Sequence, residues 1–230
     1  MRFRAYLFDV QGTLLDFFGP VSRAVKNFLD ANQITTVDAG EFTRDWRTNY
    51  FHRVRTLSQS VDQWHPVQRE YAAGFGEVCV GHGLAEPPWA AAESIASSWQ
   101  RLEPWPDVRA GMARLRRDAI TATLSNTDMS TMVSLFKNLA IDIDAVLTAE
   151  LVGAFKPDPR TYLRALQYLG VQPHETAMVA CHPYDLDAAA SLGLGTVFLS
   201  RPHEYGDPHF AHEMTAGSVD QVVRAVGDIR

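Results

Sequence analysis

Short apolar runs alternate with segments of helical spacing along much of the chain. Five runs rich in apolar or β-branched residues each end near polar residues or glycine: residues 4–8, 119–124, 145–148, 177–181 and 195–199. Four segments between the later runs have helical spacing: residues 107–117, 129–139, 159–169 and 185–192. Strands that alternate with helices predict right-handed βαβ units and a parallel sheet.

The segment between residues 18 and 100 has a different pattern. It is rich in Ala, Gln, Arg and aromatic residues, and its apolar positions recur at helical spacing. Pro104 and Pro106 mark its end, just before the alternation of strands and helices resumes. We therefore predict an α/β fold, a Rossmann-like parallel sheet core with a helical cap domain inserted after the first strand. The predicted core domain comprises residues 1–15 and 104–230, and the predicted cap domain comprises residues 16–103.

Composition and charge exclude several classes of partner. The 230 residues are 46% hydrophobic and 21% charged, and the formal net charge is −6. A nucleic-acid binder normally needs a concentrated basic face, so no nucleic-acid partner is predicted. No window reaches about 18 uninterrupted apolar residues, which argues against a membrane partner. Two cysteines do not make a disulfide framework in a chain of this length, and a cytoplasmic enzyme is predicted.

The first candidate site follows the first predicted strand, in the stretch from Asp9 to Thr13. Gly12 permits a sharp turn, so the Asp9 carboxylate and neighbouring backbone N–H groups can point into a cleft. From these residues alone Asp9 has four open roles. It could bind a metal, act as a base, attack a substrate, or satisfy the amides of its own turn.

Two further clusters follow later strands and are expected at the same sheet edge, where ligands of α/β proteins collect. Ser125 and Asn126 offer short hydrogen-bonding groups that suit an anion or a plain turn. Lys156 precedes Pro157 and a helix start, so it would neutralise a nearby carboxylate and hold it ionised. The alternative for Lys156 is an exposed position at the start of a helix.

The fourth cluster lies in the stretch "ACHPYD". Asp185 follows another apolar run, with His182 and Tyr184 beside it. Asp185 could contribute to a site or merely cap the helix that follows. His182 could likewise be an exposed loop residue.

The order and spacing of the four clusters resemble the haloacid dehalogenase superfamily, whose four motifs occur in this order. The resemblance covers about residues 1–15 and 104–230, and the insertion corresponds to the helical cap of that family. It implies that Asp9 is the nucleophile and that Lys156 is its charge partner. Thr13 and Ser125 would position Asp9 or the substrate.

Two departures distinguish this chain from the phosphatases of that superfamily. Those enzymes carry a second Asp two residues after the nucleophile, where this chain has Gln11. A neutral amide cannot be a general acid. They also place a metal-binding acid four residues before the position of Asp185, where this chain has Cys181, a poor ligand for Mg²⁺. Metal-dependent phosphoryl transfer is therefore disfavoured, and no metal or cofactor is predicted.

The branch without those acids is similar to the L-2-haloacid dehalogenases, which need no metal. That resemblance implies a halide contact from Arg47, which follows Trp46 in a cap helix, and another from Asn126. Tyr162 matches a tyrosine that helps to bind the substrate carboxylate. Tyr184 stands where the family has an aromatic residue near the halide.

Well-known members of this branch have Ser-Ser-Asn where this chain has Ala180-Cys181-His182, and they have an aromatic residue at the position of Gln11. Gln11 replaces an aromatic residue and places a polar group at the halide or substrate site. His182 replaces an asparagine, as in a subset of dehalogenases that also accept fluorinated acids.

The mechanism implied by the resemblance has two displacements. Asp9 attacks the carbon of a small 2-haloalkanoic acid that bears the halogen, which gives an ester and a halide. Water then attacks the ester to give the 2-hydroxy acid, activated by Asp185 or His182. The alternatives are a phosphatase with an unusual Mg²⁺ site, a hydrolase of another activated bond next to a carboxylate, and a non-enzymatic scaffold. Relatives in this branch are often dimers, so a homodimer is expected as well.

Overall fold

The computed structural model describes residues 3–57, 64–210 and 221–229. The chain divides into two compact units. The first unit contains Met1–Asp16 and Pro104–Arg230, and the second contains Phe17–Glu103. The two-residue strands β2 (Leu15–Asp16) and β3 (Glu103–Pro104) pair where the chain passes from one unit to the other.

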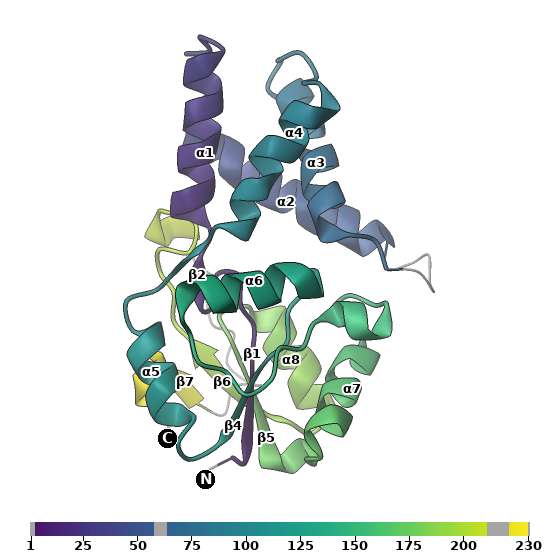
Figure 1. Cartoon of the computed structure of the whole chain (residues 1–230), viewed down its shortest axis with the longest axis vertical. Coiled ribbons are helices and arrows are strands. Elements are labelled where there is room, and N and C mark those ends of the chain that lie inside the picture. The colour runs from purple at the N-terminus through teal and green to yellow at the C-terminus, as the bar shows by residue number, and fades with distance from the viewer. Residues whose placement is uncertain (1–2, 58–63, 211–220, 230) are drawn as a thin grey trace. The chain divides into compact units, whose positions relative to one another are not determined.

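A five-stranded parallel sheet forms the centre of the first unit (Figure 1), in the order β4-β1-β5-β6-β7. Its strands are β1 (Ala5–Phe8), β4 (Ile120–Thr123), β5 (Thr176–Ala180), β6 (Gly195–Leu199) and β7 (Gln221–Val223). Every residue of β1, β5 and β6 is buried. Strands buried on both faces are typical of a sheet covered by helices on both sides. The predicted α/β fold class is confirmed.

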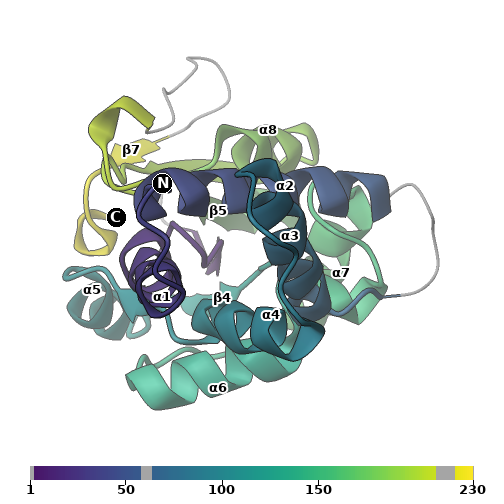
Figure 2. The ribbon, with the colours of Figure 1, turned by 90° about the horizontal axis from the view of Figure 1, so that it is seen from above.

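Helices cover both faces of this sheet. They are α5 (Val108–Leu115), α6 (Met129–Leu139), α7 (Pro159–Leu169) and α8 (Pro183–Ser191). Leu166 of α7 and Leu186 of α8 share a buried core with Leu7 of β1. Helix α5 lies on the opposite side of the sheet from α7 (Figures 1 and 2), where Gly111 packs against Val226.

One predicted strand is wrong. Residues 145–148 form isolated bridges at Ala145 and Thr148 instead of a regular strand. The Thr123 hydroxyl donates to the Leu147 carbonyl at 2.8 Å and accepts from the Leu147 N–H at 2.9 Å. At Leu147 a side chain thus takes the place of the backbone partners, and the regular ladder of a strand is interrupted. Strand β7 was not predicted, because its three residues are too few to form a pattern.

The second unit is helical, as predicted for residues 18–100. It contains α1 (Phe18–Ala31), α2 (Ala39–Leu57), α3 (Val67–Gly81), α4 (Trp89–Ala96) and the 3₁₀ turn Ser97–Gln100. Its core is aromatic: Trp46 is fully buried and donates from Nε1 to the Tyr71 carbonyl at 2.9 Å. The Tyr71 ring stacks on Trp99 with 4.2 Å between ring centres.

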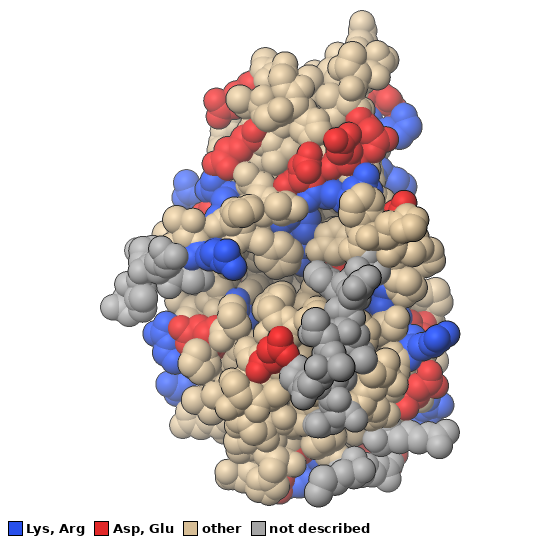
Figure 3. Space-filling model, turned by 180° about the vertical axis from the view of Figure 1, so that it is seen from behind, with Lys and Arg blue, Asp and Glu red and all other residues tan. Residues whose placement is uncertain are grey.

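The surface carries charges of both signs. Figure 3 shows acidic and basic side chains near one another on the face that it draws. Their long-range fields partly cancel where they lie side by side. Among the described residues, no helix is both long enough and apolar enough to cross a membrane.

Candidate active site

Four loops meet at the carboxyl edge of the sheet because the strands are parallel. Asp9 directly follows β1, and Ser125 lies two residues after β4. His182 lies two residues after β5, and Glu204 lies in the loop after β6. This shared edge brings side chains together that are far apart in the sequence.

The turn after β1 is fixed from several sides. Gly12 has φ +90°, a conformation that glycine adopts without strain. The indole of Trp105 donates to the Gly12 carbonyl at 2.8 Å, and Arg201 Nε donates to the Thr13 carbonyl at 2.8 Å. The backbone N–H of Asp9 still bonds to Val179 of β5 at 3.0 Å. The Asp9 carboxylate is therefore carried on a rigid support.

Three side chains hold the Asp9 carboxylate, which belongs to a residue 5% exposed. Lys156 Nζ lies 2.9 Å from Oδ1. The Thr13 hydroxyl lies 2.7 Å from Oδ2, and His182 Nδ1 lies 2.9 Å from the same oxygen. Burial raises the pKa of Asp9, but Lys156 and then His182 outweigh it, so the pKa lies well below its usual value. Asp9 is therefore ionised at neutral pH.

Lys156 is buried between two carboxylates, those of Asp9 and Asp185. Burial lowers the pKa of this lysine, but the two carboxylates raise it above its usual value. The Tyr162 hydroxyl donates to Asp185 Oδ1 at 2.5 Å, and Lys156 contacts Oδ2. Burial raises the pKa of Asp185, against the lowering effect of Lys156. A continuous network of contacts at the carboxyl edge of the sheet thus links Asp9, Lys156, Asp185 and Tyr162.

The two alternatives for the fourth cluster are wrong. Helix α8 begins at Pro183 with His182 at the N-cap position, so Asp185 lies in the first turn instead of capping the helix. His182 is 1% exposed and is not a surface loop residue. Lys156, at 3% exposed, is likewise not on the surface.

Asn126 and Ser125 form hydrogen bonds with other residues of the same unit. The Asn126 amide donates to the Lys156 carbonyl at 3.1 Å and accepts from the Lys156 N–H at 2.7 Å. Asn126 therefore fixes the backbone that carries Lys156, and its predicted halide contact stays a prediction. The Ser125 hydroxyl donates to the Thr127 hydroxyl at 3.1 Å.

Glu204 was missed by the sequence reasoning. Its side chain is 1% exposed, and its Oε1 lies 2.7 Å from His182 Nε2. A Cβ placed on Gly12 would overlap Oε1 and lie 2.8 Å from Cδ of this glutamate. The available signal was an acid in the loop after β6, which ends at the same sheet edge as the other clusters.

His182 is charged because carboxylates face both of its ring nitrogens. Burial lowers its pKa, but Cys181, Glu204 and Asp9 raise it well above the usual value. Burial also raises the pKa of the Cys181 thiol to about 11, so this thiol is neutral at pH 7. The two carboxylates therefore supply the charge that keeps the imidazole protonated at neutral pH.

The residues do not fit the Mg²⁺ ion of the phosphatase branch. Asp9, Cys181 and His182 could offer one ligand atom each, within 4.8 Å of one another. Mg²⁺ prefers an octahedral set of oxygen ligands, whereas this set includes a thiol and an imidazole. Asp9 and Glu204 face the two ring nitrogens and raise the pKa of His182, which disfavours a neutral nitrogen with a lone pair for a metal.

Gln11 and Tyr184 also lie in the first unit. Gln11 is 5% exposed, in the same turn as Asp9. The Tyr184 ring is half-buried and lies 5.7 Å from the His182 ring at an angle of 31°. Their contacts with a halide or substrate stay predictions.

Arg47 belongs to the second unit. It lies in α2 at 3% exposed and donates from Nη1 to the Tyr71 hydroxyl at 3.0 Å. Its guanidinium lies 4.8 Å from the Phe17 ring centre and 4.6 Å from that of Phe51. Aromatic faces attract a guanidinium, so this unit holds the cation in place. Its halide contact stays a prediction.

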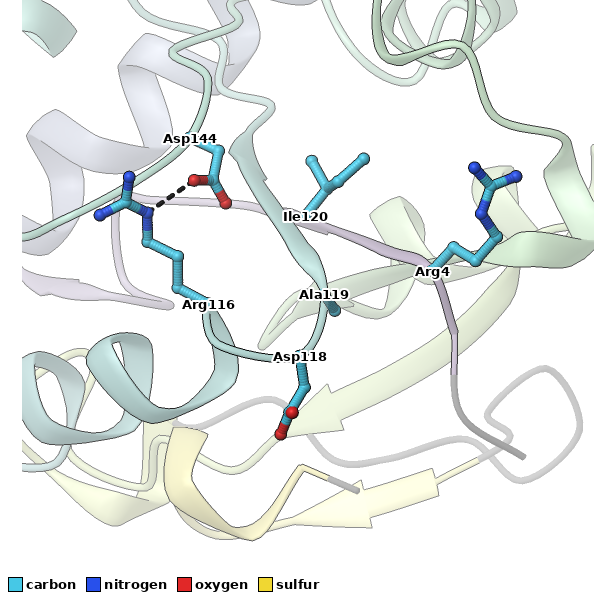
Figure 4. Close-up of a pocket in the computed structure, with 6 residues that line it drawn as sticks. All are labelled: Arg4, Arg116, Asp118, Ala119, Ile120 and Asp144. Atoms are coloured by element: carbon cyan, nitrogen blue, oxygen red, sulfur yellow. Dashed lines mark hydrogen bonds and ion pairs between the residues drawn. The ribbon is translucent and has the colours of Figure 1, made fainter.

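A hollow at the opposite edge of the sheet is separate from this site (Figure 4). It is lined by Arg4, Arg116, Asp118, Ala119, Ile120 and Asp144. Arg116 pairs with Asp144 at 2.6 Å and Arg4 pairs with Glu175 at 2.8 Å. Because both arginines are already paired with acidic side chains, the hollow does not have the properties of an anion-binding site.

A carboxylate at the edge of a parallel sheet, kept ionised by a buried lysine, in a chain that also has a helical second unit, is typical of a class of hydrolases with an aspartate nucleophile. The chain belongs to the haloacid dehalogenase-like hydrolase family, whose model matches residues 3–193. The predicted membership of the superfamily is confirmed.

The relatives of this chain include dehalogenases. It is 28% identical over 222 residues to (S)-2-haloacid dehalogenase 4A of Burkholderia cepacia. This alignment covers 93% of this chain and 91% of that protein. A crystal structure of a defluorinating L-2-haloacid dehalogenase matches with a TM-score of 0.88 and 29% identity, over 99% of this chain and 96% of the other. Another L-2-haloacid dehalogenase structure matches with a TM-score of 0.85 and 32% identity, over 97% and 96%.

Proposed function

We propose that this protein is a 2-haloacid dehalogenase that hydrolyses the carbon–halogen bond of a small 2-haloalkanoic acid through an ester on Asp9. The observation that carries the proposal is the state of Asp9, a buried carboxylate that Lys156 and His182 keep ionised. Two residues further on, Gln11 provides no acid for a leaving alcohol. The similarity to haloacid dehalogenases supports the same reaction.

The geometry of Asp9 favours one oxygen as the attacking atom. A carboxylate offers about four lone-pair directions. Among the described residues, Thr13 and His182 take two directions at Oδ2, and Lys156 takes one at Oδ1. Oδ1 retains a lone pair that can form the bond to carbon, while the electrons of the carbon–halogen bond leave with the halide.

Hydrolysis of the ester returns the enzyme to its starting state. Water attacks Cγ of Asp9 and gives a proton to the Asp185 carboxylate, whose raised pKa favours this transfer. The Cγ–Oδ1 bond then breaks, and Oδ1 leaves as the hydroxyl of the product. Lys156, 2.9 Å from Oδ1, protonates the leaving oxygen and recovers a proton from Asp185. The new Asp9 carboxyl releases one proton, which balances the halide formed.

The proposal is tested by halide release from 2-chloropropionate and 2-fluoropropionate in the presence of EDTA. We expect the wild type to release halide, Asp9→Asn to lose all turnover, and Asp118→Asn, in the hollow at the opposite edge, to retain it. A single turnover in H₂¹⁸O should place the label in Asp9 and leave the product hydroxyl unlabelled. Full turnover by Asp9→Asn, or Mg²⁺-dependent release of phosphate from a panel of esters without any halide release, would overturn the proposal.

A further inference from the structure

His182 lies between two buried carboxylates that come from different parts of the chain. Its Nδ1 lies 2.9 Å from Asp9 Oδ2, after β1, and its Nε2 lies 2.7 Å from Glu204 Oε1, in the loop after β6. His182 and Glu204 are each 1% exposed. An imidazole that faces a carboxylate on both nitrogens donates from both and carries a positive charge.

We propose that Glu204 is a positioning residue that keeps His182 charged and directed at Asp9 Oδ2 while Asp9 carries the substrate as an ester. This proposal rests on the proposed function. In the ester formed through Oδ1, Oδ2 is the carbonyl oxygen. The donors already aligned on Oδ2 are the Thr13 hydroxyl at 2.7 Å and His182 at 2.9 Å. They form an oxyanion hole for the hydrolytic step, because these distances suit donors to a developing negative charge.

Glu204 becomes necessary because the first step removes the charge of Asp9. An ester is neutral, so one of the two carboxylates that hold protons on His182 is lost when the substrate is bound covalently. Glu204 takes no part in that bond change and remains the anion opposite Nε2. A neutral imidazole with a lone pair on Nδ1 would repel the carbonyl oxygen, whereas the imidazolium donates to it.

This arrangement also indicates which residue accepts a proton from the hydrolytic water. As water bonds to Cγ of Asp9, the electron pair of the carbonyl bond moves onto Oδ2, where His182 and Thr13 donate to it. A charged imidazole cannot accept a proton, so the proton of the water passes to Asp185. When the carbonyl bond forms again, the Cγ–Oδ1 bond breaks and the product leaves with Oδ1.

The ionisable groups close to His182 include two carboxylates, one thiol and one phenol. Asp9 and Glu204 face its two nitrogens, and Cys181 and Tyr184 belong to its own segment. Burial raises the pKa of Cys181 to about 11 and that of Tyr184 to about 12, so both are neutral at pH 7. Of these four groups, the two carboxylates are therefore the anions that stabilise a positive charge on His182 at this pH.

The first experiment needs no substrate. Asp9→Asn removes the charge of Asp9, as the ester does. We expect the ring nitrogens of His182, followed by ¹⁵N NMR and assigned with a His182→Gln sample, to stay protonated at pH 7 in Asp9→Asn. In Asp9→Asn/Glu204→Gln the ring should be neutral at pH 7, while the control Asp9→Asn/Glu150→Gln keeps the charge. A neutral ring in Asp9→Asn, or a charged ring in both double variants, would overturn the proposal.

The second experiment separates the two chemical steps with 2-chloropropionate. Glu204→Gln should release one equivalent of halide at nearly the wild-type rate and then accumulate the ester, detected by intact-protein mass spectrometry. Loss of one oxyanion donor slows a reaction by about 10²–10³-fold, so we expect ester hydrolysis at pH 8 to slow by about 100-fold. The rate of hydrolysis should also fall with rising pH earlier than in the wild type. Glu204→Asp, which keeps the charge, should recover part of the rate.

Several outcomes would contradict this inference. Equal losses in both steps, or ester decay at the wild-type rate and pH profile, would show that Glu204 does not act on the hydrolytic step. Far-UV circular dichroism and thermal midpoints are compared with Glu150→Gln. If a double variant fails to fold, the single variant Glu204→Gln decides the matter. If the wild type forms no ester with any 2-haloacid, the proposed function fails, and the NMR titration still decides whether Glu204 holds the charge on His182.

Discussion

Replacement of Lys156 by methionine tests the buried charge network most directly. The change keeps much of the volume of the side chain but removes the cation between Asp9 and Asp185. The side chains of Lys156 and Asp185 are completely buried, and that of Asp9 is 7% exposed, so water cannot replace the lost charge. We expect both carboxylates to be destabilised in the folded protein.

The size of the effect follows from the distances. Two unit charges 2.9 Å apart attract by about 6 kcal/mol at an effective dielectric constant of 20. The desolvation of the ions offsets part of this energy, and removal of one partner from a buried pair destabilises proteins by about 3–5 kcal/mol. Lys156→Met should therefore lower the free energy of unfolding by about 3–5 kcal/mol at pH 7, in urea titrations. Lys137→Met, the same change at an exposed position of the same unit, should change it by less than about 0.5 kcal/mol.

The loss of stability in Lys156→Met should depend on pH in a defined direction. The folded-state pKa of Asp9 lies below its unfolded value, so its contribution to stability is present above about pH 4 and is lost as the pH falls. The deficit of Lys156→Met should thus be largest near pH 7 and shrink below pH 4. As the pH is lowered, the rate of halide release in a single turnover should begin to fall at a higher pH in Lys156→Met than in the wild type, because loss of the lysine raises the pKa of Asp9. A deficit below 1 kcal/mol, or one independent of pH, would refute this account.

Two further substitutions test contacts within single units, each by its urea midpoint. Gly12→Ala should destabilise more than Gly83→Ala, because both glycines have positive φ but only at Gly12 would the new methyl group overlap a buried carboxylate; equal losses would refute the steric argument. Tyr71→Phe removes the acceptor of a buried guanidinium hydrogen bond and should cost about 1–3 kcal/mol. Tyr168→Phe, at a residue 54% exposed, is its control, and a loss of the same size there would contradict the prediction.

The spacing of apolar residues predicted the secondary structure well where the pattern is regular. The helices 129–139 and 159–169 and the strand 195–199 have the predicted bounds in the structure. Helical spacing and apolar runs depend on neighbours in the sequence, so they can be seen without a structure. The run 145–148 failed for a different reason. Its ladder is interrupted at Leu147 by the hydroxyl of Thr123, a residue more than twenty positions away.

The same distinction holds for the candidate site. Asp9, Lys156 and Asp185 were singled out because each follows a strand or precedes a helix in a family-like order. Glu204 followed no motif, and neither its charge nor its neighbours distinguish it from other loop glutamates. Only the meeting of the loops after β5 and β6 places it 2.7 Å from His182.

Most of the order of the elements, the presence of a sheet and of a helical segment, and the acids and lysine of the motifs could be predicted from the sequence alone, whereas β7 and the interruption at residues 145–148 could not. The tertiary structure decided which oxygen meets which donor, and which histidine is buried between two anions. A pKa depends on burial and on charges within a few ångströms, and these distances exist only once parallel strands have brought distant loops to one edge.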